Sequence, residues 1–124
     1  MSSTLQAWKQ LLKSRPDLVG GGIERIEDPE GSFRGPIASI EIKQNRLIVT
    51  TWWTAYHDPM RPDKPWTRVI EPGATELIYE LCDCSTSRPH DMGKGRIFFQ
   101  YPFSRITIFP RGGSSLDRRK VVGL

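Results

Sequence analysis

The chain has little of what metal centres, disulfide frameworks and membrane spans require. Two cysteines and two histidines occur among its 124 residues. The longest uncharged run, "LIVTTWWTAY", has ten residues, about half of what a helix needs to cross a bilayer. Lys9 and Gln10 stand where a secretion signal would have its apolar run. The sequence therefore predicts a soluble, cytoplasmic protein with no membrane span.

The two cysteines, Cys82 and Cys84, are separated by a single residue. On a strand they would point to the same face, about 7 Å apart, which is too far for an unstrained disulfide. Zinc sites usually place about two to four residues between paired cysteines. Even together with His57 and His90, the pair is a poor match to such a site. We predict two reduced thiols, no metal and no cofactor.

Basic residues gather at the end of the chain. The net charge is +4, and the segment from Arg111 onward, "RGGSSLDRRKVVGL", holds four basic residues against one acid. The rest of the chain is close to neutral, whereas nucleic-acid-binding domains usually carry a basic face on the fold itself. Glycine, serine and charge offer little to bury. We therefore expect one domain over residues 1–111 and a basic flexible tail over 112–124.

One helix is expected, at the start of the chain. Ser3 and Gln6 form a capping box, and apolar residues then recur at helical spacing. Pro16 disfavours the helical conformation of the residue before it. The pattern predicts a helix over about residues 3–14, with an apolar stripe of Leu5, Trp8, Leu11 and Leu12.

The remainder is typical of strands. Proline and glycine separate runs rich in β-branched and aromatic residues. We expect strands near residues 22–27, 37–43, 46–57, 66–71, 75–84, 95–101 and 104–110. About seven strands with short connections favour a mainly β fold, in which a single antiparallel sheet closes into a small barrel. A β-sandwich is the alternative.

The best-defined hairpin turns at Gln44 and Asn45. Its predicted register pairs Ile42 with Leu47, Ile40 with Val49 and Ala38 with Thr51. Continued to residue 57, the alternation gives a core face of Leu47, Val49, Thr51, Trp53, Ala55 and His57. The second face carries Ile48, Thr50, Trp52, Thr54 and Tyr56.

Both faces of this strand are apolar, and such a strand is usually covered on both sides. Three candidates could bury the second face. The N-terminal helix is the nearest. A second copy of the chain could dock through Ile48, Trp52 and Tyr56, or a ligand could occupy the space.

A proline-rich loop, "HDPMRPDKPW", follows this strand. Prolines remove ladder donors, so the loop should project as a stiff connection, and loops at a barrel end are common binding sites. The predicted ligand is a small apolar or aromatic molecule. The predicted ligand-binding residues are Trp52, Trp53, Tyr56, His57, Trp66 and Arg68.

Three functions remain open. We favour a non-enzymatic binding or interaction module that uses this aromatic region. The alternative is a nucleic-acid-binding small barrel, in which Phe98 of "GKGRIFFQYPFSR" stacks on bases and the basic tail contacts phosphate. An enzyme comes third, because no motif presents a nucleophile to His57 and Asp58, and no catalytic residue is predicted.

Overall fold

The computed structural model describes residues 3–27, 31–57, 63, 66–69, 76–81, 87–101, 104–112 and 121–122. Two helices come first, α1 (Thr4–Ser14) and the short 3₁₀ helix η1 (Pro16–Leu18). The strands that follow are β1 (Gly22–Glu27), β2 (Gly31–Lys43), β3 (Arg46–Thr51), β4 (Thr54–His57), β5 (Trp66–Val69), β6 (Glu76–Glu80), β7 (His90–Asp91), β8 (Ile97–Tyr101), β9 (Ser104–Phe109) and β10 (Val121–Val122).

The predicted N-terminal helix is confirmed. The Ser3 hydroxyl accepts a hydrogen bond from the backbone N–H of Gln6 at 3.1 Å, which satisfies one of the free donors at the helix start. At the other end Arg15 leaves the helical conformation, with φ −128° and ψ 64°, immediately before Pro16. The chain therefore turns at residue 15 and leads through η1 into β1.

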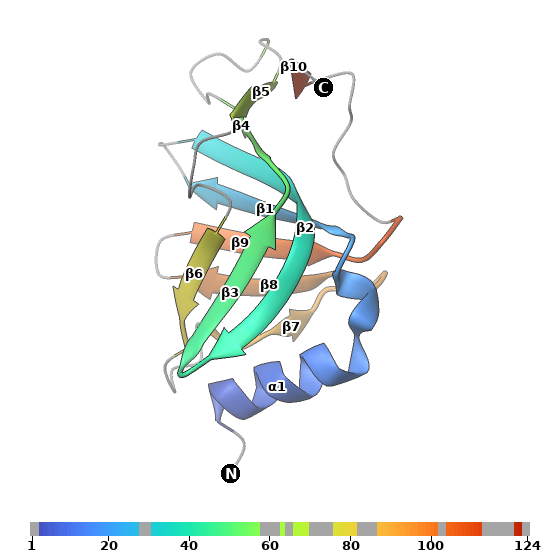
Figure 1. The fold of residues 1–124 in the computed structure, drawn as a ribbon, viewed down its shortest axis with the longest axis vertical. Helices are drawn as coiled ribbons and strands as arrows, with labels where there is room; N and C mark the ends of the chain where they lie inside the picture. Colours follow the sequence, from blue (N-terminus) through green and yellow to red (C-terminus); the bar gives the residue numbers. More distant parts are fainter. Residues whose placement is uncertain are drawn as a thin grey trace.

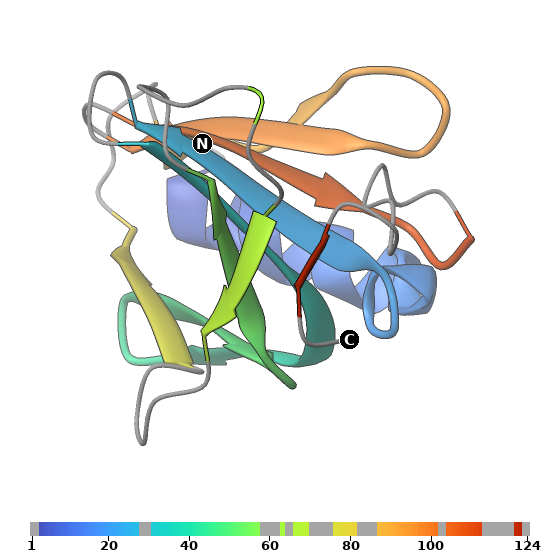
Figure 2. The same cartoon turned by 90° about the horizontal axis from the view of Figure 1, so that it is seen from above.

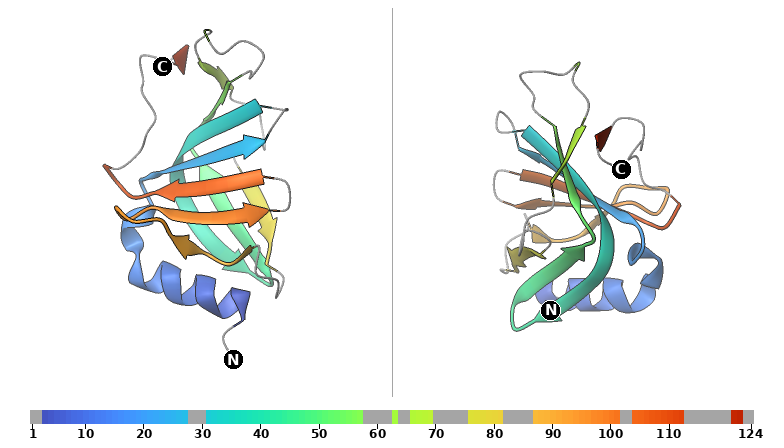
Figure 3. Two further views of the ribbon diagram at one scale, coloured as in Figure 1. Left: turned by 180° about the vertical axis from the view of Figure 1, so that it is seen from behind. Right: turned by 45° about the horizontal axis from the view of Figure 1, so that its top comes forward.

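The strands form one sheet around a long, curved β2 (Figure 1). The main path of hydrogen-bonded strands is β10-β5-β4-β2-β1-β9-β8-β7, and β3 and β6 branch from β2. All ladders are antiparallel except the one between β10 and β5. The first half of β2 pairs with β1 and β4, and its second half pairs with β3. Because β2 curves, the part of the sheet that contains β1, β9 and β8 faces the part that contains β3 and β6 across the core (Figure 3).

The expected barrel closure is wrong. In the described part of the chain, β6 pairs with β3 alone and β7 pairs with β8 alone. The helix α1 crosses the open side, with β8 and β9 on one flank and β3 and β6 on the other (Figure 2). Closing the barrel would bring these two sheet edges together and leave no room for the helix. The fold is a mainly β, largely antiparallel sheet that stays open and is completed by α1.

Aromatic side chains fill the space between α1 and the sheet. Trp8 of the helix meets Phe99 of β8 edge to face, with ring centroids 5.0 Å apart. Tyr79 of β6 meets the same Phe99 at 5.2 Å and Tyr101 at 5.2 Å. The Trp8 indole N–H donates to the backbone carbonyl of Ser87 at 2.8 Å, so its one polar group is satisfied. Edge-to-face rings thus join β6 to β8, between which the described residues form no ladder.

The register of β2 with β3 departs from the prediction at one point. The pairs Ile42–Leu47 and Ile40–Val49 are confirmed, but Thr51 lies opposite Ile37 instead of Ala38. Ala38 is the extra residue of a β-bulge, which bends β2. This bend lets one strand serve both halves of the sheet.

A second register shift divides the expected strand over 46–57 into β3 and β4. Thr51 pairs with Ile37, and Ala55 pairs with Arg34. Ala55 is four residues after Thr51, but its partner Arg34 is only three residues before Ile37. The segment from β3 to β4 therefore contains one extra residue, in the Trp52–Trp53 region. The backbones of β2 and of the Trp52–Trp53 segment approach each other closely at Gly35, where an added Cβ would collide with the Trp53 carbonyl oxygen. Only glycine fits at that point.

Candidate functional site

The structure separates the predicted ligand-binding residues. Trp52 follows the last residue of β3 and is 69% exposed, whereas Trp53 and His57 are partly buried. Tyr56 on β4 is 41% exposed. The backbones of Trp66 and Arg68 lie on β5, which pairs with β4 through Thr67–Tyr56 and Arg68–Ala55. The side chains of Trp66 and Arg68 lie outside the described part, as do Asp58 and the prolines that follow it.

Tyr56 does not share a face with Trp52, which corrects the predicted patch. Residues paired across antiparallel strands lie on the same face of a sheet. Tyr56 pairs with Phe33, Phe33 with Arg25, and Arg25 with Ile106. Ile106 is fully buried in the core, so Tyr56 stands at the far end of the core-side face. The register shift at Trp52–Trp53 causes this change of face.

The N-terminal helix does not cover the second face of this strand, and cover by a second copy or a ligand stays a prediction. Ile48 lies directly opposite Ile78 of β6, and Ile78 is 49% exposed. By the alternation of β3, Trp52, the residue after the strand, falls on the same face beyond the Thr50–Glu76 pair. We call Ile48, Ile78 and Trp52 the outer surface. The helix does not lie on it, because α1 inserts Trp8 on the opposite, concave side of the β3–β6 ladder.

Charged side chains border the outer surface. Arg46 and Glu80, paired across β3 and β6, form an exposed salt bridge at 2.7 Å. Glu41 lies opposite Ile48 on β2 and contacts Lys43 at 3.6 Å. An apolar centre with a charged rim is the usual composition of a protein contact surface.

Trp52 is held by its backbone although its ring is exposed. Its N–H donates to the Pro36 carbonyl at 3.0 Å, and the Gly35 crossing fixes the neighbouring backbone of Trp53. An indole presented from a fixed backbone loses less conformational entropy on binding than one on a mobile loop.

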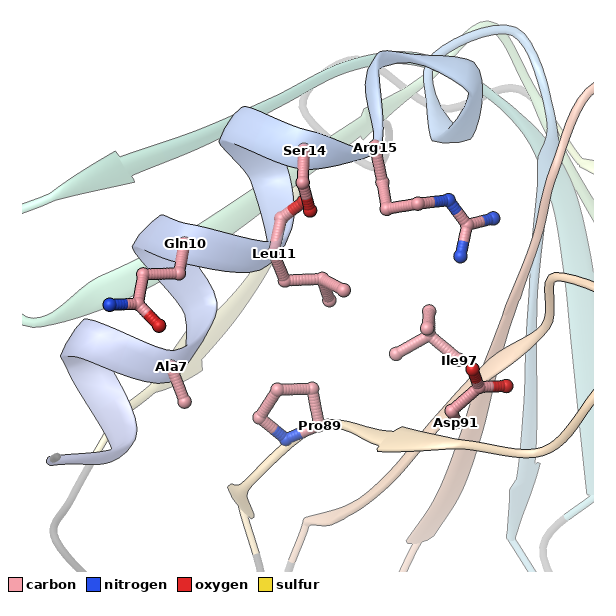
Figure 4. A pocket seen from close by; sticks show the side chains of 8 residues that line it. All are labelled: Ala7, Gln10, Leu11, Ser14, Arg15, Pro89, Asp91 and Ile97. Carbon is pink, nitrogen blue, oxygen red and sulfur yellow. The ribbon is translucent and has the colours of Figure 1, made fainter.

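A second candidate region is a groove of about 550 Å³ between α1 and the β7–β8 hairpin (Figure 4). Its wall is apolar at Leu11, Pro89 and Ile97, and polar at Arg15 and Asp91. The full lining is Ala7, Gln10, Leu11, Ser14, Arg15, Pro89, Asp91 and Ile97. The groove has room for a small molecule.

Arg15 is fixed at one end of this groove. Its Nε and Nη2 atoms donate to the two carboxylate oxygens of Asp17, each at 2.9 Å, and Nη2 also donates to the Gly95 carbonyl at 2.7 Å. The hydrogen bond from Arg15 lowers the pKa of Asp17 below its usual value, and the same bond raises the pKa of Arg15. These contacts tie the end of α1 to the tip of the β7–β8 hairpin.

The two histidines cannot share a metal ion. His57 is on β4 and His90 is on β7, with β2, β1, β9 and β8 between them. Strands lie about 4.8 Å apart, which puts the two imidazoles on the order of 20 Å from each other. Cys82 and Cys84 lie outside the described residues. Within the described ranges, no three His, Cys, Asp or Glu side chains come together as metal ligands would.

Sequence reasoning missed Ile78 and Arg15. Ile78 was placed on a strand, but its pairing with Ile48 depends on a long-range ladder that no local pattern reveals. Arg15 has a local signal, because the sequence "RPD" places an arginine two residues before an aspartate across a proline. Such spacing favours a local ion pair where a helix ends.

Comparison with known proteins finds no matching family model, no similar curated protein and no solved structure that matches this fold. Among the helices that the structure describes, none is long and apolar enough to cross a membrane.

Proposed function

We propose that this protein is a non-enzymatic interaction module that binds a protein partner through the outer surface of Ile48, Ile78 and Trp52. The observation that carries the proposal is the 69% exposure of Trp52. Tryptophan is the residue most enriched among those that dominate binding energy at protein interfaces. An exposed indole four residues along from the Ile48–Ile78 pair adds to the apolar surface on this side.

The two sides of the β3–β6 ladder support this proposal. On the concave side Leu47 and Val49 are fully buried and Tyr79 is 2% exposed. The outer side continues the same strands and remains open. The described core therefore does not use Trp52, and a partner would bury it.

Panning a phage-displayed library of random peptides against the wild-type protein tests the proposal. Enriched clones should bind the Trp52→Ser variant at least about tenfold more weakly, because one anchor side chain typically contributes that much or more. Met92→Ser is the matched control, because Met92 is also exposed, at 46%, and lies at the end of β7. The proposal is wrong if no clone is enriched, or if the enriched clones bind both variants equally.

One observation favours the nucleic-acid alternative. Phe98 and His90 lie side by side on the outer face of β7 and β8, with ring centroids 6.5 Å apart, and Arg105 is exposed on β9. Bases stack on such rings. Fluorescence anisotropy with labelled oligo-dT would support this alternative if binding weakened steeply with salt and was lost in Phe98→Ala. Under the proposed function, oligo-dT does not bind.

A further inference from the structure

One edge of β6 pairs with no strand in the described part of the chain, and this free edge lies beside the outer surface. Leu81 N–H donates to the Asn45 carbonyl at 2.7 Å, toward the β3 side. Hydrogen-bonded pairs alternate along an antiparallel ladder, so Leu77 and Tyr79 also direct their backbone groups toward β3. The backbone N–H and C=O groups of Glu76, Ile78 and Glu80 then point away from β3.

An independent contact agrees with this assignment. The Glu80 N–H, which should point away from β3, donates to the hydroxyl of Tyr101 on β8 at 3.0 Å. That bond occupies one end of the edge. No described strand pairs with the rest of it, which leaves Glu76 and Ile78 with backbone groups suited to a further strand.

The side chains along this edge define what such a strand should carry. Ile78 is 49% exposed, and Glu76 and Glu80 stand two residues to either side of it, both exposed. A strand added beside β6 places a side chain about 5 Å from each of these three. An apolar residue fits opposite Ile78, and basic residues fit opposite the two glutamates. Glu80 already contacts Arg46 at 2.7 Å, so Glu76 contributes most of the charge preference.

The same charges disfavour a second copy of this chain at the edge. Two copies paired antiparallel about Ile78 would place Glu76 of each opposite Glu80 of the other. Like charges directly opposite each other destabilise a strand pair, and charged edges commonly prevent self-association in natural sheets.

We infer that the partner of this module presents an extended segment, with basic residues flanking an apolar one, that adds as a strand to the free edge of β6. This inference rests on the proposed function and specifies how the partner docks. Main-chain hydrogen bonds to Glu76 and Ile78 supply affinity. The apolar side chain of the added strand extends the Ile48–Ile78 row, and Trp52 borders the same side.

Amide hydrogen exchange followed by NMR tests the inference, with a synthetic peptide in which threonine alternates with lysine, valine and lysine. In the free protein the Ile78 amide should exchange faster than those of Leu77 and Tyr79. At saturating peptide its exchange should slow about tenfold. A peptide with glutamate in place of lysine should give no protection, and neither should a lysine peptide whose amides facing β6 are N-methylated. Glu76→Lys should abolish protection by the lysine peptide.

Other outcomes overturn the inference. Protection that persists with the N-methylated peptide would mean docking through side chains alone. Protection of Ile78 that rises with protein concentration, with no peptide present, would make a second copy the occupant. If panned clones need Trp52 but leave the Ile78 exchange unchanged, strand addition is wrong while the proposed function stands. If no clone is enriched and the lysine peptide gives no protection, both fail.

Discussion

The concave and outer sides of the β3–β6 ladder differ in composition and in surroundings. On the concave side Val49 and Tyr79 pack under α1 with Phe99, and Tyr79 and Phe99 meet edge to face at 5.2 Å. On the outer side Ile78 is 49% exposed and Trp52 is 69% exposed. The apolar side lies under the helix, whereas on the outer side Glu76, Glu80 and Arg46 flank the Ile48–Ile78 pair.

This comparison separates stability from recognition. Two sets of hydrogen bonds fix the helix. Trp8, near its middle, donates to the Ser87 carbonyl, and Arg15, at its C-terminal end, binds Asp17 and the Gly95 carbonyl. Side chains under the helix should therefore control the free energy of unfolding. Side chains on the outer surface should control binding and change stability little.

The largest effect is expected from Trp8→Ala, which removes the centre of the concave side. Its side chain is fully buried, and truncation of such a residue costs about 3–5 kcal/mol through lost contacts and the cavity left behind. Urea denaturation followed by circular dichroism measures the change. Lys9→Ala, at an exposed position of the same helix, should stay within about 0.5 kcal/mol of wild type. A similar loss in both variants would contradict the role of Trp8 burial, since alanine has the higher helix propensity at either position.

A smaller effect is expected from Tyr101→Phe, which tests the contact between β6 and β8. The variant removes the oxygen that accepts the Glu80 N–H and keeps the ring that meets Tyr79. A single hydrogen bond contributes about 0.5–1.5 kcal/mol, and this exposed one should lie at the lower end. The Glu80 amide should also exchange faster by NMR. Tyr101→Leu, which loses the ring contact as well, should be clearly less stable than Tyr101→Phe.

The tie between Arg15 and Asp17 predicts a pH dependence of stability. The pKa of Asp17 is lowered in the folded protein by its hydrogen bond to Arg15, so the folded state favours the ionised carboxylate. Its stabilising contribution is complete above the usual pKa of 3.8 and is lost as the pH falls through the lower folded value. The effect should be small, because Asp17 is at the surface. Thermal unfolding of wild type and Asp17→Asn should differ near neutral pH and converge in acid. A constant difference at all pH values would contradict the charge-based explanation.

The smallest effect on stability is expected from Trp52→Ser. The indole is 69% exposed, and substitutions at such surface positions usually change the free energy of unfolding by no more than about 0.5 kcal/mol. Urea denaturation should give overlapping curves for the two proteins. A loss of several kcal/mol would show that Trp52 is part of the core and would break the contrast between the two sides.

Local patterns predicted the helix and most of the strands, but missed the first half of β2 and the short strands β7 and β10. Ser3, Gln6 and Pro16 defined the helix, and alternation around Gln44 and Asn45 gave two of three hairpin pairs correctly. These signals act over a few residues, where turn chemistry and side-chain periodicity decide the conformation.

Register shifts and long-range docking could not be predicted. The bulge at Ala38 and the extra residue near Trp52 each move side chains to the other face, and no residue type requires either bulge. The barrel prediction failed because α1 occupies the side where closure would occur. The faces of Trp52 and Tyr56, and with them the predicted six-residue site, depended on these non-local features.

The affinity of panned peptides for the Trp52→Ser variant is the decisive measurement for the outer surface. Binding should fall at least about tenfold, while the urea denaturation curve should stay that of the wild type. The Met92→Ser control should keep both. Peptides that bind Trp52→Ser as tightly as wild type would contradict the claim that the outer surface of β3 and β6 is the contact surface of this protein.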